Sequence, residues 1–384
     1  MVIHGVNLHP SRRANIRVLV VANLISGLIH GFYNVILQPF IVKMIESTGR
    51  NVNPEETLGL IMTAAALIQI IPMIFASKIS DKIGRKRVIL GSFIFLPVSM
   101  LLFGTSGLLS IKYPFSYYSF GANFPLKIAS FSEISITSFP IAYALAVAFL
   151  GLSCVSISFG FGDPAVSALV AESAEKKKTA SSFSIINLAF YATGLIGPLV
   201  IRVLTDRIEI WVYFYVLAVL RLIMFLYQLI ALKEPHIIKD YTSSISKQFV
   251  QSLIAIYQMF LQMFKSIFLY LSIPYYFIKR RKKQSVRSDY YNEVETNLTL
   301  FRDIFRNPGV PYAIGFFILD ALTWGLSISI FWGSLVTQYD FNEGNIAVLQ
   351  LAFSVSTLLI FIPVTKISDK LKKSELLLLS QLTG

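Results

Sequence analysis

Long runs of apolar residues dominate this sequence, and their length constrains the fold more than any other feature. Each run approaches or exceeds the roughly 20 residues that an α-helix needs to cross the ~30 Å hydrocarbon core of a bilayer. The runs lack the alternation of apolar and polar residues that strands show, and an open sheet cannot satisfy its backbone in lipid. We therefore predict eight membrane helices, over residues 18–44, 58–76, 88–103, 141–171, 180–204, 210–232, 311–337 and 346–364.

The composition agrees with a membrane protein. Of the 384 residues, 55% are hydrophobic and only 14% are charged, and the mean hydropathy is +0.65. A water-soluble protein keeps about a quarter of its residues charged. The net charge of +13 comes largely from short basic segments between apolar runs, which indicates binding to anionic membrane lipids and no nucleic-acid partner. The single cysteine, Cys154, excludes an intrachain disulfide.

The basic segments also predict the orientation of the chain. They fall at residues 12–17, 78–87, 176–178, 279–283 and 366–373, which are the N-terminus and every second connection. The connections between them carry little positive charge. Because Lys and Arg favour the cytoplasmic side, we expect a multi-pass protein of the plasma (cytoplasmic) membrane with its N-terminus in the cytoplasm.

One further apolar segment, residues 249–278, does not fit a simple crossing, because basic residues lie at both of its ends. Its polar side chains recur at helical spacing and form one stripe. These are Gln251, Gln258, Gln262, Lys265 and Ser272. We predict an amphipathic helix on the inner leaflet. The alternative is a re-entrant hairpin that breaks near Ser272 and Pro274.

This segment lies in a stretch that divides the chain. We expect a six-helix transmembrane bundle over residues 1–235, a cytoplasmic central loop over 236–307, and an incomplete second bundle over 308–384. A last apolar run begins near residue 375 and reaches Gly384 after two or three turns.

A short internal repeat relates the two bundles. Residues 78–83 (KISDKI) recur as 366–371 (KISDKL), and each copy follows the second predicted helix of its set. Loop sequences repeated at matching positions indicate two related halves, which is a common plan among transporters.

The first copy continues as DKIGRKR, and this loop resembles the signature G-x-x-x-D-R-x-G-R-R of the major facilitator superfamily (MFS). Ser77 replaces the first glycine of the signature and Lys82 its first arginine. Residues 162–172, 194–198 and 233–235 also resemble the family's fourth-helix end, fifth helix and sixth-helix exit. The resemblance covers residues 18 to about 375.

This resemblance implies an all-α polytopic membrane protein: an MFS-like six-helix N-terminal bundle, then the first two helices and the start of a third of a C-terminal bundle. It implies a secondary active transporter that moves a small-molecule solute by alternating access in a rocker-switch motion. Proton coupling is common in the family, so H+ is a second candidate partner. The fourth-helix arginine of proton-driven exporters has no counterpart here, and the fifth-helix antiporter motif is incomplete.

Two other interpretations stay open at this point. Because the family usually has twelve helices, the chain can be a truncated, transport-incompetent MFS fragment, or an oligomer can supply the missing helices. A membrane-embedded enzyme or lipid-modifying protein is the second alternative, with an acid such as Asp163 at its centre.

The aspartate loops are the candidate gates. Charges on the inner ends of two helices can hold the cytoplasmic side closed and must separate when the bundles rock. The candidates are Asp81, Gly84, Arg85, Lys86 and Glu172 in the first half, and Asp369 and Lys370 in the second. The simpler interpretation is that these loops only orient the protein in the membrane.

Polar residues inside the predicted helices are candidates for a central cavity, because polar groups are costly against lipid. His30, Asn34 and Gln38 share one face of the first helix, and Asp320 and Trp324 share one face of the seventh. Asp320 can carry a proton or attract a cationic solute, and His30 can relay a proton. The alternative role for these residues is hydrogen bonding between helices.

Arg221 lies midway along the sixth predicted helix, where it needs a partner or a water-filled face. It can bind an anionic solute or pair with an acid such as Asp163 or Asp320, and the sequence does not choose between these.

Enzyme motifs are absent from the sequence. It contains no G-x-x-x-x-G-K-[ST], no H-E-x-x-H and no G-x-S-x-G. The four histidines lack the spacing of metal ligands on one helix face. We therefore predict no catalytic residues, no metal site and no cofactor.

Overall fold

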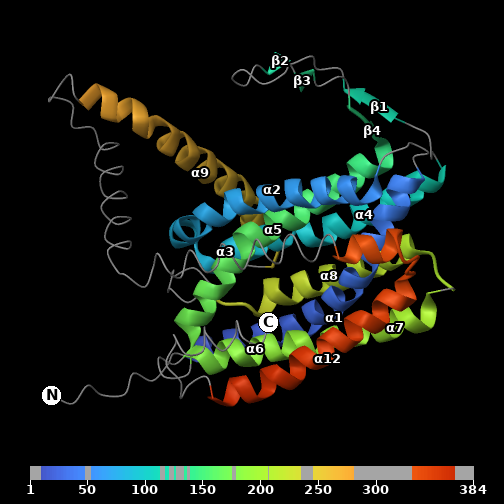
Figure 1. Ribbon diagram of the computed structural model, residues 1–384. Helices are drawn as coiled ribbons and strands as arrows, with labels where there is room; N and C mark the ends of the chain where they lie inside the picture. The colour runs from blue at the N-terminus through green and yellow to red at the C-terminus, as the bar shows by residue number, and fades with distance from the viewer. Residues whose placement is uncertain are drawn as a thin grey trace.

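A computed structural model gives the fold of the chain. It describes residues 10–47, 53–112, 117–120, 125–126, 134–135, 139–174, 179–205, 207–234, 245–280 and 331–367. Among these residues, seven helical segments are long and apolar enough to cross a membrane. Six of them pack side by side as a bundle (Figure 1).

The bundle begins with α1 (Pro10–Glu46) and α2 (Pro54–Ile83). The third span is α3 (Arg85–Phe93) followed by α4 (Phe95–Lys112), and the fourth is α5 (Tyr143–Ser173). The fifth span is α6 (Thr179–Gly194) followed by α7 (Ile196–Leu204), and the sixth is α8 (Ile210–Ala231). The six predicted helices are thus present, the first three longer than expected and the other three close to the expected length.

Two spans are interrupted by a proline. Pro97 and Pro198 have no backbone N–H to offer the carbonyls four residues earlier, which belong to Phe93 and Gly194. These are the last residues of α3 and α6. Only one residue separates each pair of helices, so each pair still forms a single span.

Short strands occur in the connection between α4 and α5, a feature that the sequence analysis did not predict. β1 (Tyr117–Phe120) pairs antiparallel with β4 (Phe139–Ala142), and β2 (Pro125–Leu126) pairs with β3 (Ile134–Ser135). The β1–β4 pair lies near the end of the bundle that is opposite the α2–α3 turn, and the β2–β3 pair lies apart from the bundle on the side of α2 (Figure 1).

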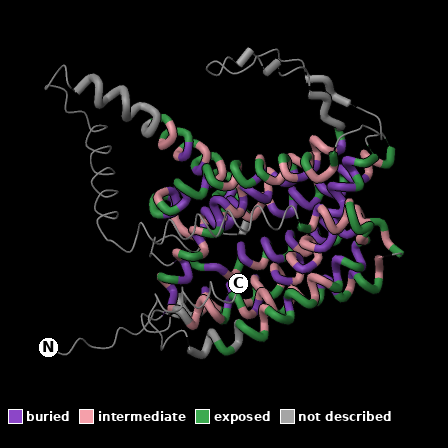
Figure 2. The backbone as a smooth tube through the Cα atoms, in the orientation of Figure 1, coloured by how far each residue is buried: buried purple, intermediate pink, exposed green. Residues whose placement is uncertain are grey.

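Small residues set the distance between α1 and the fifth span. A Cβ on Gly31 would lie 2.1 Å from the carbonyl oxygen of Gly194, and one on Gly197 would lie 2.3 Å from the backbone nitrogen of Phe32. The two backbones therefore touch, as small residues allow in membrane bundles. Buried residues gather between the helices, and exposed ones lie mainly on their outer sides (Figure 2).

The last part of the chain that the structure describes, residues 331–367, packs against the bundle from one side. Residues 331–337 are helical, and α12 (Glu343–Ile367) packs against α7, α6 and α1. Of the seventh and eighth predicted helices, the eighth is therefore present, and most of the seventh lies outside the described residues.

The central loop contains one long helix, α9 (Ile245–Arg280), which leaves the bundle obliquely (Figure 1). It is helical through Ser272 and Pro274, so the re-entrant hairpin was wrong. A narrow stripe of α9 is buried against α3, α2 and α8. Its members are Ser252, Ala255, Met259 and Met263. Gly91 of α3 allows the close approach, because a Cβ there would lie 3.3 Å from the carbonyl oxygen of Ser252.

Candidate functional site

A cavity of about 350 Å³ opens among the helices of the bundle. Its wall combines aromatic and aliphatic side chains with a set of polar ones drawn from α1, α2, α5 and α8. The polar members are Asn23, Ser26, His30, Gln69, Asp163, Arg221 and Gln228. Ligand sites in proteins have this size and this mixture of apolar surface and few polar groups.

Arg221 is the cation of this wall, and its side chain is almost fully enclosed. The residue is 4% exposed. One terminal nitrogen, Nη1, donates a 2.9 Å hydrogen bond to the hydroxyl of Ser26 on α1. The Nε–H is buried and has no hydrogen-bond partner. The buried amide oxygen of Gln228, two turns further along α8, is also without a partner.

His30 lies on α1 and contacts Asn34 one turn later. The ring nitrogen Nε2 is 2.8 Å from the amide nitrogen of Asn34. Because an amide nitrogen can only donate, Nε2 accepts this bond and the imidazole is neutral. The ring also packs on Phe190 of α6, with 4.9 Å between centroids. Gln38 is buried further along α1, and its amide oxygen has no partner.

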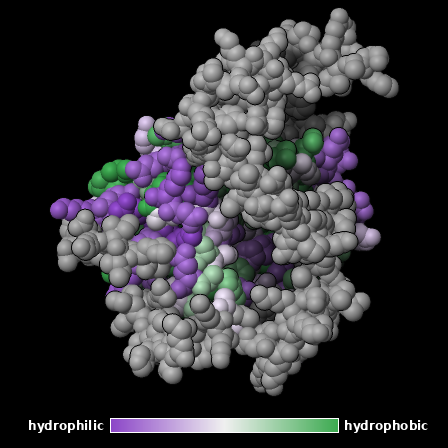
Figure 3. All heavy atoms as spheres, turned by 90° about the vertical axis from the view of Figure 1, so that its left-hand side faces the viewer, coloured by the Kyte–Doolittle hydropathy of each residue, from purple (hydrophilic) through white to green (hydrophobic). Residues whose placement is uncertain are grey.

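A cluster of charges lies at one end of the bundle, where α2 turns into α3. The Nη2 atom of Arg85 is 2.5 Å from a carboxylate oxygen of Asp81 and 2.9 Å from one of Glu172 at the end of α5. Arg85 Nε is 3.2 Å from the same Glu172 oxygen, and Nη1 donates to the hydroxyl of Ser80. Figure 3 looks onto this end, where hydrophilic side chains gather among the described atoms.

Glu234, just beyond α8, holds the start of α3. Its two carboxylate oxygens accept hydrogen bonds from the backbone N–H groups of Arg85 and Lys86, at 2.8 and 3.0 Å. A carboxylate at a helix N-terminus satisfies free N–H groups and complements the helix dipole. Gly84 makes room for it, with φ of +107° and an ideal Cβ position only 2.9 Å from a Glu234 oxygen.

The same turn is tied to two other elements. Lys86 Nζ donates a 3.0 Å bond to the side-chain oxygen of Gln248 on α9. On α1, the buried amide of Asn15 bonds both the carbonyl and the N–H of Lys233, at 2.8 and 2.9 Å. The α2–α3 turn, the end of α8 and the start of α1 are therefore joined through polar contacts.

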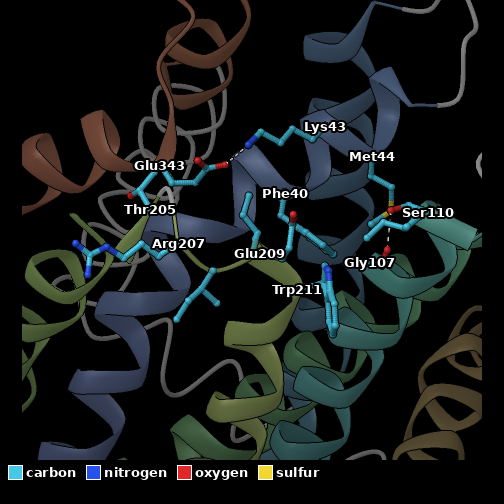
Figure 4. A pocket seen from close by; sticks show the side chains of 13 residues that line it. Phe40, Lys43, Met44, Gly107, Ser110, Thr205, Arg207, Glu209, Trp211 and Glu343 are labelled. Carbon is cyan, nitrogen blue, oxygen red and sulfur yellow. Dashed lines mark hydrogen bonds and ion pairs between the residues drawn. The ribbon is translucent and has the colours of Figure 1, made fainter. Parts of the chain in front are cut away.

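A second cavity, of about 340 Å³, lies at the opposite end of the bundle, between the end of α1 and the start of α8. Lys43 of α1 and Glu343 of α12 point toward each other across its mouth and form an ion pair (Figure 4). Glu55, at the start of α2, accepts hydrogen bonds from Thr337 and Gln338. At this end the first bundle is thus bonded to the segments around α12.

Comparison with known proteins identifies this architecture. The profile described as "Major Facilitator Superfamily" matches residues 19–383, nearly the whole chain. The chain belongs to the major facilitator superfamily. No curated protein matches its sequence significantly.

Solved structures of MFS transporters share the fold at low sequence identity. A crystal structure of a point mutant of the peptide transporter POT in complex with sulfate aligns with a TM-score of 0.51 at 13% identity, covering 96% of this chain and 71% of that one. The human organic anion transporter MFSD10 (TETRAN) gives 0.50 at 15%, covering 92% and 72%. The E. coli xylose transporter XylE, in a partially occluded inward-open conformation, gives 0.51 at 12%, covering 94% and 74%.

Family and fold together settle the broad class of this MFS protein. It is a multi-pass membrane protein and a transporter rather than an enzyme.

The structure separates the predicted site residues of this MFS transporter into groups. His30 and Arg221 line the first cavity. Asn34 is hydrogen-bonded to His30 but is not part of the wall, and Gln38 also lies outside it. The loop residues Asp81, Gly84, Arg85, Lys86 and Glu172 come together at one end of the bundle. Asp320, Trp324, Asp369 and Lys370 lie outside the described residues.

Sequence reasoning missed three contributors to these sites. Asp163 was considered only as a partner for Arg221 or as the centre of an enzyme, and it lines the cavity without forming an ion pair with Arg221. Gln228 was not among the predicted site residues, although a lone amide in an apolar helix indicates a polar contact or a polar cavity. Glu234 was recognised only as part of a helix exit, and its contact with the α2–α3 turn spans 149 residues.

Proposed function

We propose that this protein is a secondary active transporter that moves a small solute across the plasma membrane by alternating access, with its N-terminus in the cytoplasm. The single observation that carries the proposal is the polar cavity in the bundle with a bonded polar cluster at each end. In alternating access such a cavity opens to one side at a time, so contacts at each end must form and break in turn.

The inner gate would be the cluster of Asp81, Arg85 and Glu172. Because Arg85 contacts a carboxylate on its own turn and another on α5, movement of α2 relative to α5 must break at least one of these contacts. Charge-assisted hydrogen bonds of this kind are strong enough to favour one arrangement and weak enough to exchange.

The outer gate would include the Lys43–Glu343 ion pair and the bonds that Glu55 accepts from Thr337 and Gln338. These contacts join helices of the first bundle to the part of the chain around α12. Opening the outer side by a rocking motion would separate them.

Proton movement is the coupling that this cavity supports best. Asp163 is an exposed carboxyl on the cavity wall, and it forms no ion pair with Arg221. Ionisable residues inside the membrane mark ion and proton pathways in many transporters. A proton-coupled transporter would stop accumulating solute when a protonophore collapses the pH gradient, and unchanged accumulation would contradict this coupling.

α9 supports the cytoplasmic placement of the central loop. Beside its buried stripe it exposes large apolar side chains, with Tyr257 and Phe268 67% and 69% exposed. The sequence KRRKK follows at residues 279–283. An apolar face with a basic tail fits the inner leaflet, where anionic headgroups attract Lys and Arg.

Alternating access can be tested without knowing the solute. A reporter cysteine replaces the cavity residue Gln69 in a Cys154→Ser background, and a membrane-impermeant maleimide is applied to right-side-out and inside-out vesicles. We expect labelling from both sides, since the cavity opens to each in turn. Labelling from one side only would contradict the mechanism.

The gate assignment is tested by transport. Cells expressing the protein are screened with sugars, carboxylates, amino acids and toxic cations, and the responding solute is then used with variants. Asp81→Asn and Glu172→Gln should slow transport while the protein still reaches the membrane. Glu56→Gln is the matched control, because Glu56 is exposed at the other end of α2. Full transport by both gate variants would defeat the assignment.

A further inference from the structure

We propose that Arg221 binds the anionic group of the transported solute, so that the substrate class is a small organic acid bearing a carboxylate. This inference rests on the proposed transport function and specifies the chemistry of its cavity.

The first argument is the cost of burying Arg221. A guanidinium remains charged in a protein, and taking it out of water costs several kcal/mol unless a counter-charge compensates. Among the ion pairs of the described residues, none includes Arg221. Its one oxygen partner there, the Ser26 hydroxyl, is neutral. A buried cation with a neutral partner is poised to accept an anion.

The second argument is that two buried hydrogen-bonding groups, on residues that line the cavity, have no partner. The Nε–H of Arg221 is buried without a partner, although Arg221 lines a cavity large enough for a small molecule. A carboxylate has two oxygens in the geometry that a guanidinium edge binds best. The unpartnered oxygen of Gln228, another residue of the same wall, can accept a hydrogen bond from a hydroxyl or N–H of the solute.

The third argument is the charge of the remaining wall. His30 accepts a hydrogen bond at Nε2 and is neutral, so it contributes no second cation. Among the described residues of the wall, Asp163 is the acidic one. A negative charge in the same cavity weakens the binding of an anion and strengthens that of a cation. The two charged residues therefore predict opposite effects of their removal, which makes the proposal testable.

The test measures thermal unfolding of the full chain in detergent micelles. The probes are sodium lactate and sodium benzoate, with lactamide and benzamide as uncharged matches and benzylamine as the cation. A ligand that binds only the folded state raises the unfolding temperature. We expect at least one carboxylate to raise it and the matched amide to have no effect.

Variants then assign the effect to Arg221. Arg221→Gln should weaken carboxylate binding at least about tenfold, the scale of one charge-assisted hydrogen bond. Arg221→Lys keeps the charge without the two-donor edge and should bind with intermediate affinity. Asp163→Asn should bind the carboxylate more tightly than the wild type does. Arg202→Gln is the control, because Arg202 is exposed on α7 and outside the cavity wall.

Several results would overturn the proposal. These are a wild-type protein that responds to no carboxylate, equal binding by Arg221→Gln, or weaker carboxylate binding by Asp163→Asn. If Arg221→Gln does not fold, Arg221→Lys and Asp163→Asn still decide. Transport of a neutral or cationic solute would leave the transport function standing and sink this inference. Carboxylate binding without any transport in proteoliposomes would support this inference and contradict the transport function.

Discussion

Glu234 provides the sharpest test of how the charged end of the bundle is held together. Its carboxylate is largely buried and bonds two backbone N–H groups at the start of α3. In Glu234→Ala these donors lose their acceptor at a helix N-terminus. Loss of an N-cap costs about 0.5–2 kcal/mol, and each bond to a charged group contributes about 1.5–3 kcal/mol.

Two effects reduce the sum of those contributions. Burial raises the pKa of the Glu234 carboxyl above its ordinary value despite the two backbone bonds, which means that burying the ionised group is costly. The site also lies at the end of the bundle, where water can replace a missing acceptor. We therefore expect Glu234→Ala to lower the free energy of unfolding by about 2 kcal/mol, or the unfolding temperature by about 3–6 °C.

The assay is thermal unfolding of the purified protein in detergent, compared with a matched variant. Glu209 is the residue before α8 and makes no side-chain capping bond, so Glu209→Ala should change stability by less than about 0.5 kcal/mol. Glu234→Gln, which retains one acceptor oxygen, should lie between the two. If Glu234→Ala and Glu209→Ala unfold at the same temperature, the capping argument is refuted.

Three other predictions concern packing, charge and pH. Gly197→Ala should destabilise the protein by about 1–3 kcal/mol, because its Cβ meets the backbone of α1. Gly59→Ala in α2 has open space and should be stabilising by up to about 1 kcal/mol in the same thermal assay. A double-mutant cycle of Lys43→Ala and Glu343→Ala should give a coupling below about 1 kcal/mol, because the lysine side chain is 56% exposed; a larger coupling would contradict this. Since burial raises the pKa of Glu234 above 4.5, the folded state holds that proton more tightly than the unfolded chain. The stability of the wild type relative to Glu234→Gln should therefore fall as the pH rises from 4.5 through the folded-state pKa, and a rise in unfolding experiments over that range would be contrary evidence.

The α2–α3 turn bonds to α5, to the end of α8 and to α9 at once, through Glu172, Glu234 and Gln248. A movement of any of these elements therefore changes a contact made by the start of α3. The turn therefore connects the central-loop helix α9 to the proposed gate residues.

Some features of this protein follow from local sequence alone. The apolar runs predicted the spans because crossing a bilayer requires a fixed length of apolar helix, whatever packs beside it. The DKIGRKR loop predicted the family because it combines a turn glycine, Gly84, with charges at fixed spacing. The backbone of Gly84 has a φ of +107°, a conformation that glycine adopts more readily than other residues.

Other features depended on contacts between residues far apart in the chain. The sequence offered Asp163 and Asp320 as equal partners for Arg221, and only the packing of α8 against α1 placed Ser26 at its guanidinium. It predicted a surface helix in the central loop but kept a hairpin as the alternative, because a proline limits a helix without forbidding it. The membrane spans depend on whether each segment meets lipid or water, which its own residues determine. The cavity and the capping contacts depend on which helix faces pack together. That packing is decided only when the whole bundle forms.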